Sequence, residues 1–316
     1  MTASAMVDVI TLGESMVVLR PVDAIPVASA PLFTAGVAGA ESNVAVGLSR
    51  LGHAVAFAGR VGDDAAGTRI RRTLRGEGID VAGLRTDAAA PTGLLIRDCG
   101  SPRGISVDYH RHGSAGSRLQ PSDLADVGIA TARVLVVTGL TCGLSEEAAA
   151  TVAAAIRIAS DHDVTVVLDP NLRFRLQTPQ VWRELVDPLL QRCDVVLTSP
   201  DELATVIGDD TPERLAGRLR DRGVGTVVLR AGSAVTHAFD ADGHTSVEVE
   251  PAAVVDPVGA GDAFTAGFVS GMLDDLSMTD RIRRAHQVAR RCVQSPGDIE
   301  GLPTRAELLA DIEVAR

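Results

Sequence analysis

Short apolar runs bounded by turn residues alternate along the chain with longer segments in which apolar residues recur at helical spacing. The apolar runs predict buried strands, and their Val, Leu and Ile content is typical of strands that helices cover on both faces. This alternation indicates an α/β protein with a mostly parallel central sheet. We predict strands at 7–13, 54–62, 134–139, 164–170, 193–199 and 225–232, and helices at 41–51, 64–77, 145–160, 179–190, 201–207, 212–222, 259–273, 279–294 and 305–313.

Two segments, 14–36 and 91–112, break this alternation because they read as short strands joined by turns. They follow the first strand and the second α/β unit, so a small discontinuous β-sheet covering one end of the large sheet would fit both. Ordinary surface hairpins are the alternative. No composition shift marks a linker, so we expect residues 1–316 to form one three-layer αβα domain with this lid.

Composition restricts the kind of protein. Hydrophobic residues make up 46% of the 316 residues, and no apolar run approaches the roughly 18 residues of a membrane span. The first residues lack the basic start and apolar stretch of a signal peptide, so we expect a cytoplasmic protein without a membrane partner. The net charge of −11 argues against binding to nucleic acid.

The chain has no lysine, so all 30 Lys and Arg residues are arginine. That excludes Schiff-base chemistry and the phosphate-binding lysines of P-loop enzymes and protein kinases. Phosphate chemistry here would have to use backbone amides, helix N-termini and arginine. The four cysteines form no CxxC pair, so we expect buried free thiols rather than a zinc site or a disulfide framework.

The strongest chemical signal is the segment 256–264, Asp-Pro-Val-Gly-Ala-Gly-Asp-Ala-Phe, which lies between an apolar β-rich run and a helical one. Small residues at a helix start let backbone N–H groups approach an anion, and the helix N-terminus adds partial positive charge. Asp262 falls in the first helical turn, where it could take a proton from a hydroxyl that attacks phosphorus. A plain helix cap is the alternative. A dinucleotide-binding turn is disfavoured because no glycine follows three residues after Gly261.

These residues resemble the D-T-x-G-A-G-D signature of the ribokinase-like (PfkB) carbohydrate kinases, with Pro257 in place of Thr. The segment 38–52 resembles the second signature of that family, a Gly-Gly turn followed by N-x-A and a helix, with Ala38 in place of the first glycine. The segment 59–67 resembles the stretch that normally follows. The likeness covers nearly the whole chain in the right order.

The resemblance implies an ATP-dependent phosphotransferase with Asp262 as catalytic base. The backbone amides of Gly259, Ala260 and Gly261 would form the anion hole. Gly39 and Asn43 would contact sugar hydroxyls, although Asn43 could instead cap a helix. Glu14, which directly follows the first strand, would also face the substrate.

The resemblance further implies ATP, Mg²⁺ and a monovalent cation such as K⁺. Glu202 would help hold Mg²⁺ through water, but Ser199 and Glu202 also fit a capping box, and the two readings are equally good. Ser199 replaces the family's usual Asn, the second glycine of a G-x-x-G turn is lost, and His286 stands where an adenine-side Asn is frequent. The implied positions are, for the nucleotide, Ser199, Arg230, Gly232, Gly259, Gly261 and His286 and, for the monovalent cation, Asp256.

Three passages resemble the 2-keto-3-deoxygluconate kinases of this family, at 109–117, 169–173 and 297–305. By that likeness Tyr109, Arg111 and Arg173 would reach a sugar acid, with Leu140 as an apolar wall. Arginine suits a carboxylate because it offers two donors in one plane. Solvated loop charges are the alternative for both arginines.

Other functions stay open from the sequence. The same fold could phosphorylate fructose, ribose or a nucleoside. A sensor of sugar or nucleotide that has lost catalysis is a third possibility, supported by the departures at Pro257 and Ser199. The family likeness also implies a homodimer joined through the lid sheets.

Overall fold

The computed structural model describes residues 7–23, 25–98, 105–232 and 234–314. A nine-stranded sheet runs through the molecule in the order β13-β12-β11-β10-β9-β8-β1-β4-β5. The strands from β5 to β11 are parallel, and the antiparallel pair β12 and β13 extends one edge. Its strands are β1 (Val9–Leu12), β4 (Val55–Gly62), β5 (Leu84–Asp87), β8 (Val134–Thr138), β9 (Thr165–Asp169), β10 (Val195–Thr198), β11 (Thr226–Ala231), β12 (Val235–Asp240) and β13 (Gly243–Glu248).

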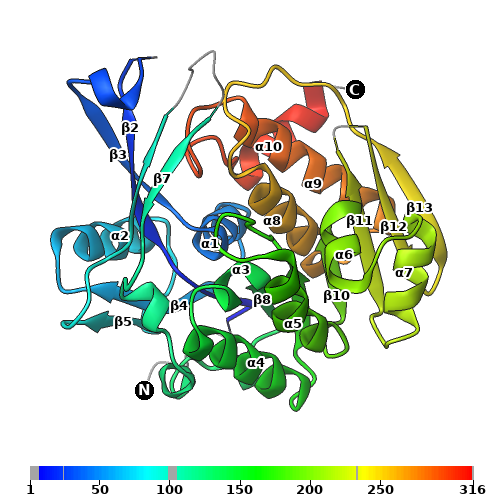
Figure 1. The fold of residues 1–316 in the computed structure, drawn as a ribbon. Coiled ribbons are helices and arrows are strands. Elements are labelled where there is room, and N and C mark those ends of the chain that lie inside the picture. Colours follow the sequence, from blue (N-terminus) through cyan, green and yellow to red (C-terminus); the bar gives the residue numbers. More distant parts are fainter. Residues whose placement is uncertain (1–6, 24, 99–104, 233, 315–316) are drawn as a thin grey trace, which may run out of the picture.

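Helices cover both faces of this sheet, as the apolar strands predict (Figure 1). Successive side chains of a strand point to opposite faces, so in β8 Leu135 joins one core cluster and Val136 the other. On one face lie α3 (Gly139–Cys142), α4 (Glu146–Ser160), α5 (Pro179–Leu190), α6 (Pro200–Ile207) and α7 (Pro212–Arg220). On the other face lie α1 (Ala40–Arg50), α2 (Ala65–Gly76), α8 (Ala260–Leu273), α9 (Met278–Val293) and α10 (Arg305–Val314). The connecting segments include the 3₁₀ turns Val27–Ser29, Gly116–Arg118, Pro121–Leu124 and Ile129–Thr131.

A second sheet of four strands stands out from the body, in the order β3-β2-β6-β7 (Figure 1). It combines strands from both segments that break the alternation of the sequence, so the predicted discontinuous lid sheet is confirmed. β2 and β6 are parallel neighbours, and the two outer strands run antiparallel to them. The strands are β2 (Met16–Pro21), β3 (Phe33–Ala38), β6 (Leu94–Arg97) and β7 (Val107–His110).

The structure adds strands that the pattern did not predict. β5 has the sequence LRTD, which is short and half polar, and the hairpin of β12 and β13 lies at the sheet edge with many exposed side chains. The predicted buried thiols are confirmed for Cys142, Cys193 and Cys292, while Cys99 lies outside the described residues. No helix in the described part of the chain is long and apolar enough to span a bilayer.

The parallel strands all deliver their following loops to the same edge of the sheet. Glu14 follows β1, Leu140 follows β8, Asn171 follows β9 and Ser199 follows β10, while Arg230 lies near the end of β11. In open α/β sheets, ligands bind outside the carboxyl ends of the strands. The fold therefore brings most of the predicted site residues to one edge.

Candidate active site

The glycine-rich turn lies where the sequence pattern predicts, at the start of α8. Gly259 is the N-cap residue with φ of 81°, a left-handed conformation that favours glycine. A Cβ atom at this position would lie 2.8 Å from the backbone oxygen of Asp298, so there is no room for a side chain. The N–H groups of a first helical turn have no acceptor within the helix, so they can bind an anion. Here the Ala260 N–H donates a long hydrogen bond of 3.4 Å to the Pro257 backbone oxygen, which an anion at the turn would replace.

Asp262 lies in this first turn and faces a partner from the other family signature. Asn43 of α1 donates a hydrogen bond from Nδ2 to Oδ2 of Asp262 at 2.8 Å, and both side chains are buried. The two helices lie so close together that a Cβ atom added to Gly47 would lie only 2.7 Å from the Cβ atom of Ala266. Small residues on both helices thus bring the two signatures together.

Burial raises the pKa of Asp262 to about 7, although the hydrogen bond from Asn43 and the charge of Arg173 oppose the shift. A carboxyl group with a pKa near neutrality suits proton transfer, because it is partly ionised yet still basic at the working pH. Asp262 therefore has a pKa that suits a general base, while the N-cap position of α8 belongs to Gly259.

A cavity of about 400 Å³ opens onto Asp262. Its walls consist of the Gly259–Gly261 turn and of residues from β7, from the loop after β9 and from α6. These segments lie far apart in the sequence. Among them are three residues assigned to substrate or metal from the sequence, Tyr109, Arg173 and Glu202. The structure thus brings the predicted base, anion hole and one predicted carboxylate-binding arginine into one cavity.

A second cavity, of about 680 Å³, lies next to the first and shares Arg230, Ala260 and Gly261 with it. Gly232 and His286 line it, which agrees with their assignment to the nucleotide side. The His286 ring pairs with the Thr236 hydroxyl at 2.9 Å, and burial lowers the pKa of His286. Two adjoining cavities that meet at a glycine-rich helix start can hold two substrates with a phosphate between them.

Arg230 lines both cavities, and Phe264 lines the second one. The Arg230 guanidinium lies 5.6 Å from the Phe264 ring centroid and pairs with the carboxylate of Asp169 at 3.1 Å. Sequence reasoning assigned no role to Asp169, although the D-x-N-x-R match contained it. Asn171 of that match adopts a left-handed conformation with φ of 44° and also lines the first cavity.

Glu41 is another buried acid that the sequence analysis missed. It lies in the first turn of α1 and accepts hydrogen bonds from the hydroxyls of Thr138 and Thr141. Burial raises its pKa, and its charge contributes to the raised pKa of Asp262. The signal for it was an acid in the first turn of the helix that carries the second family signature.

On the lid side, Glu14 and Arg111 bind each other. Nε of Arg111 lies 2.8 Å from Oε2 of Glu14, and the Ser114 hydroxyl donates to Oε1. The Glu14 side chain is buried and enclosed, since Cβ atoms on Gly93 or Gly116 would lie within 2.7 Å of it. Glu14 therefore orients Arg111, and its direct contact with substrate stays a prediction.

Ser199 and Glu202 form the capping box that was one of the two readings. Ser199 Oγ accepts from the Glu202 N–H, and Glu202 Oε2 accepts from the Ser199 N–H, each at 3.2 Å. Glu202 also accepts a hydrogen bond from the Leu172 N–H at 2.8 Å and still lines the first cavity. The capping role is confirmed, and the position leaves a metal role open. Within the described residues, no group of three or more His, Cys, Asp or Glu could hold a metal ion.

The remaining predicted positions lie near the site but serve the backbone or the core. A Cβ atom on Gly39 would lie 2.4 Å from the Glu14 backbone oxygen, so the start of α1 requires glycine. Leu140 is buried in α3 and does not line the 400 Å³ cavity. Asp256 is buried and bound to Arg97 of the lid strand β6.

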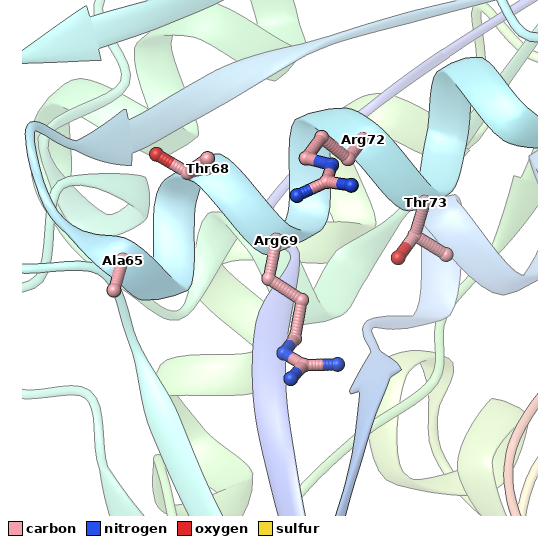
Figure 2. A pocket seen from close by; sticks show the side chains of 5 residues that line it. All are labelled: Ala65, Thr68, Arg69, Arg72 and Thr73. Atoms are coloured by element: carbon pink, nitrogen blue, oxygen red, sulfur yellow. The ribbon is translucent and has the colours of Figure 1, made fainter.

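A surface hollow along α2 contains none of the predicted site residues. It is lined by Ala65, Thr68, Arg69, Arg72 and Thr73, whose side chains come from this one helix (Figure 2). Arg69 and Arg72 make it basic, but no buried polar group faces it. The chemistry is therefore concentrated at the carboxyl edge of the sheet.

Comparison with known proteins agrees with this geometry. The family model of the pfkB family carbohydrate kinases matches residues 6–305. The chain is 33% identical to a 2-dehydro-3-deoxygluconokinase of Bacillus subtilis (strain 168), over 98% of this chain and 96% of the relative. It is 32% identical to a 2-dehydro-3-deoxygluconokinase of Thermoproteus tenax, over 96% of this chain and 94% of the relative.

Solved structures show the same fold. A PfkB protein from Polaromonas sp. JS666 is 34% identical, with a TM-score of 0.88 over 96% of this chain and 99% of that one. A fructokinase from Vibrio cholerae O395, with fructose, ADP and potassium ion bound, is 25% identical, with a TM-score of 0.84 over 98% of this chain and 99% of that one. The family model, the relatives and the solved structures each match nearly the whole chain, and this chain is a member of the pfkB family of carbohydrate kinases.

Proposed function

We propose that this sugar kinase transfers the γ-phosphate of ATP to a hydroxyl of 2-keto-3-deoxygluconate. The observation that carries the proposal is the single cavity in which Asp262, the Gly259–Gly261 turn, Tyr109 and Arg173 meet. Two relatives that match the chain over nearly its full length are named 2-dehydro-3-deoxygluconokinase, which supports a sugar acid as substrate.

In the proposed reaction Asp262 accepts the proton of the sugar hydroxyl. The hydroxyl oxygen then bonds to the γ-phosphorus, and the bond between that phosphorus and the bridging oxygen of ADP breaks. Negative charge spreads over the transferring phosphoryl oxygens during this step. The N–H groups of the Gly259–Gly261 turn and the N-terminus of α8 are fixed in place to stabilise it.

Arg173 is the residue best placed to bind the acid group of the substrate. It lines the same cavity as Asp262, and its charge lowers the pKa of Asp262, so the two groups interact electrostatically. Arg111 differs, because its guanidinium is already paired with the buried carboxylate of Glu14. Arg111 would therefore offer substrate only the part of its charge that Glu14 does not neutralise.

ATP would lie across the second cavity, with its base between Gly232 and His286 and its phosphates reaching the turn. Mg²⁺ keeps several waters and uses one or two carboxylates together with substrate phosphates. Glu202 and Asp169, which both line the first cavity, are the carboxylates here that fit such a site. The ion would neutralise charge on the nucleotide phosphates.

The test compares substrates and one matched pair of variants. Purified protein with ATP and Mg²⁺ should release ADP faster with 2-keto-3-deoxygluconate than with fructose or ribose. Arg173→Ala should lower kcat/KM for the acid by about 10–100-fold, as expected for loss of a charge-assisted contact of roughly 1.5–3 kcal/mol. The loss with a neutral sugar should be much smaller and should reflect only the effect of the Arg173 charge on the pKa of Asp262. Arg175→Ala is the control, since Arg175 lies two residues away and donates to the Val107 backbone oxygen at 3.3 Å.

A kinase for a neutral sugar is the second candidate, because Glu14 balances the charge of Arg111. Equal losses with the acid and with fructose in Arg173→Ala would favour it. No ADP release with any sugar would leave a protein that binds sugar or nucleotide without catalysis. In that case calorimetry with ATP and each sugar would identify the ligand.

The lid sheet also suggests an association between two copies. Its outer strand β3 and the turn before it expose the apolar side chains of Phe33 and Leu32, at 39% and 64%. Exposed apolar groups on a sheet that projects from the body favour contact with a second lid. Light scattering of the purified protein would show a mass twice that of the 32.8 kDa chain, and Leu32→Glu should reduce it.

A further inference from the structure

Arg97, the last residue of lid strand β6, is fully enclosed where the lid meets the segments of Asp256 and Asp298. Its side chain is 2% exposed and contacts two buried carboxylates from other parts of the chain. Nη2 lies 2.7 Å from Oδ2 of Asp256, and Nη1 lies 3.0 Å from Oδ2 of Asp298. A buried guanidinium between two carboxylates is well compensated and firmly held.

Both carboxylates belong to the segments that shape the anion hole. Asp256 is three residues before Gly259, and its Oδ1 accepts a hydrogen bond from the Val258 N–H at 3.1 Å. The backbone oxygen of Asp298 is the atom that a Cβ on Gly259 would meet at 2.8 Å. Arg97 thus joins the two segments whose backbones set the position of the turn.

The resemblance to ribokinase-like enzymes implies a monovalent cation near Asp256, and the fructokinase from Vibrio cholerae contains potassium. The residues present here do not fit such an ion at Asp256. Its two oxygens already accept from Arg97 and from the N–H groups of Val258 and Gly297. A cation bound to the same carboxylate would lie close to the guanidinium in a buried site, where like charges repel strongly.

We propose that the Arg97 guanidinium takes the place of the monovalent cation, so that this kinase keeps its anion hole in position without potassium. The inference rests on the proposed phosphotransfer, in which the Gly259–Gly261 turn stabilises the transferring phosphoryl group. Arg97 touches neither substrate in this account and is a positioning residue. It also links the turn to the lid, because β6 pairs with β7, which carries Tyr109.

The first test needs no variant. Wild-type kcat and KM are measured in potassium, sodium and choline chloride at equal ionic strength, which keeps screening constant. We expect the same values in all three salts. Activation by potassium of several-fold over choline would overturn the proposal.

The second test removes the guanidinium. Arg97→Ala should lose about 10²-fold in kcat, the effect of a displaced catalytic group, and should regain part of it with potassium or guanidinium ions. Arg97→Lys keeps a positive charge and should retain more activity without added cation. Arg85→Ala is the control, because Arg85 is also a strand arginine paired with a carboxylate, that of Asp126 at 3.1 Å, but belongs to edge strand β5 of the large sheet. It should show no response to added cations.

Thermal unfolding gives a readout that does not depend on the substrate. Potassium or guanidinium should raise the Tm of Arg97→Ala relative to choline and leave wild type unchanged. A specific rise in wild type, or full activity of Arg97→Ala in choline, would refute the replacement of the cation. The replacement of the cation would also be refuted if Arg97→Ala lost activity and neither ion restored it, because Arg97 would then be an ordinary structural contact. If wild type phosphorylates no sugar, the proposed function fails, while the unfolding data still decide the cation question.

Discussion

Replacing Asp262 with asparagine should abolish most activity and at the same time stabilise the protein. Asparagine keeps an oxygen that can accept the hydrogen bond now made by Asn43 at 2.8 Å, but it cannot take a proton from a hydroxyl. We expect kcat to fall by ~10²–10⁴-fold, the usual contribution of a general base. Stability should rise because the buried carboxylate of the wild type is ionised at an energetic cost.

The size of the stabilisation follows from the raised pKa. Burial moves the pKa of Asp262 from 3.8 to about 7. Each pKa unit corresponds to roughly 1.4 kcal/mol, so the ionised group destabilises the folded state by up to ~4 kcal/mol. For a chain of 316 residues, with an unfolding entropy of roughly 2.1 cal/mol/K per residue, this corresponds to a Tm change of ~6 °C.

The size of this stabilisation depends on pH. Because the folded-state pKa of Asp262 is raised, the folded protein holds a proton between about pH 4 and 7 that the unfolded chain has lost. Wild-type stability therefore falls as pH rises through this window and levels off above it, whereas Asp262→Asn lacks this contribution. The difference in free energy of unfolding between the two proteins should grow from pH 4 to 7 and then stay constant.

Coupled assays of ADP release and denaturant unfolding at several pH values would measure both effects. Asp201→Asn is the control, because Asp201 also lies in a first helical turn but is exposed. A stability difference that is the same at pH 5 and pH 8 would show that the pKa of Asp262 is not raised. An unchanged kcat in Asp262→Asn would remove the residue from the role of base.

Three further substitutions follow from the same contacts. Asn43→Ala removes the hydrogen bond that favours the ionised form of Asp262, so the acidic limb of the pH–rate profile should move to higher pH; an unmoved limb would contradict the contact. Gly259→Ala forces a left-handed conformation at roughly 1–2 kcal/mol and brings a methyl group against the Asp298 backbone oxygen, so both Tm and kcat should fall, whereas unchanged kinetics would mean that the turn does not form the anion hole. His286→Ala should raise the KM for ATP several-fold, by loss of a contact of roughly 1 kcal/mol, and leave the KM for the sugar unchanged in steady-state kinetics, while equal changes in both would place His286 elsewhere.

The layered fold could be predicted because each buried strand reads as a short apolar run and each covering helix as a longer periodic one. β5 and the hairpin of β12 and β13 were not predicted because they lie at sheet edges, where polar and partly exposed residues interrupt the apolar run. The lid could be placed because its two segments interrupt the alternation of strands and helices. The parallel pairing of β2 with β6 could not be predicted in this way.

The turn and the base of the site could be predicted because their spacing within nine residues has a direct chemical meaning. Contacts between distant segments could not. The pairing of Glu14 with Arg111 and that of Asp256 with Arg97 join residues far apart in the chain, and neither partner shows a local signal for the other. For this reason the sequence could assign Glu14, Arg111 and Asp256 to ligands but could not show that each has an ion-pair partner within the protein.

The close approach of α1 and α8 through Gly47 and Ala266 has a consequence for how the chain can be divided. Asn43 and Asp262, which are joined by a hydrogen bond, lie on these two helices and are separated by 219 positions. A break anywhere between the helices would leave each fragment with one member of this pair and an unpartnered apolar helix face. Activity could return only when the fragments reassociate, so complementation of split chains would report directly on the fit of these two helices.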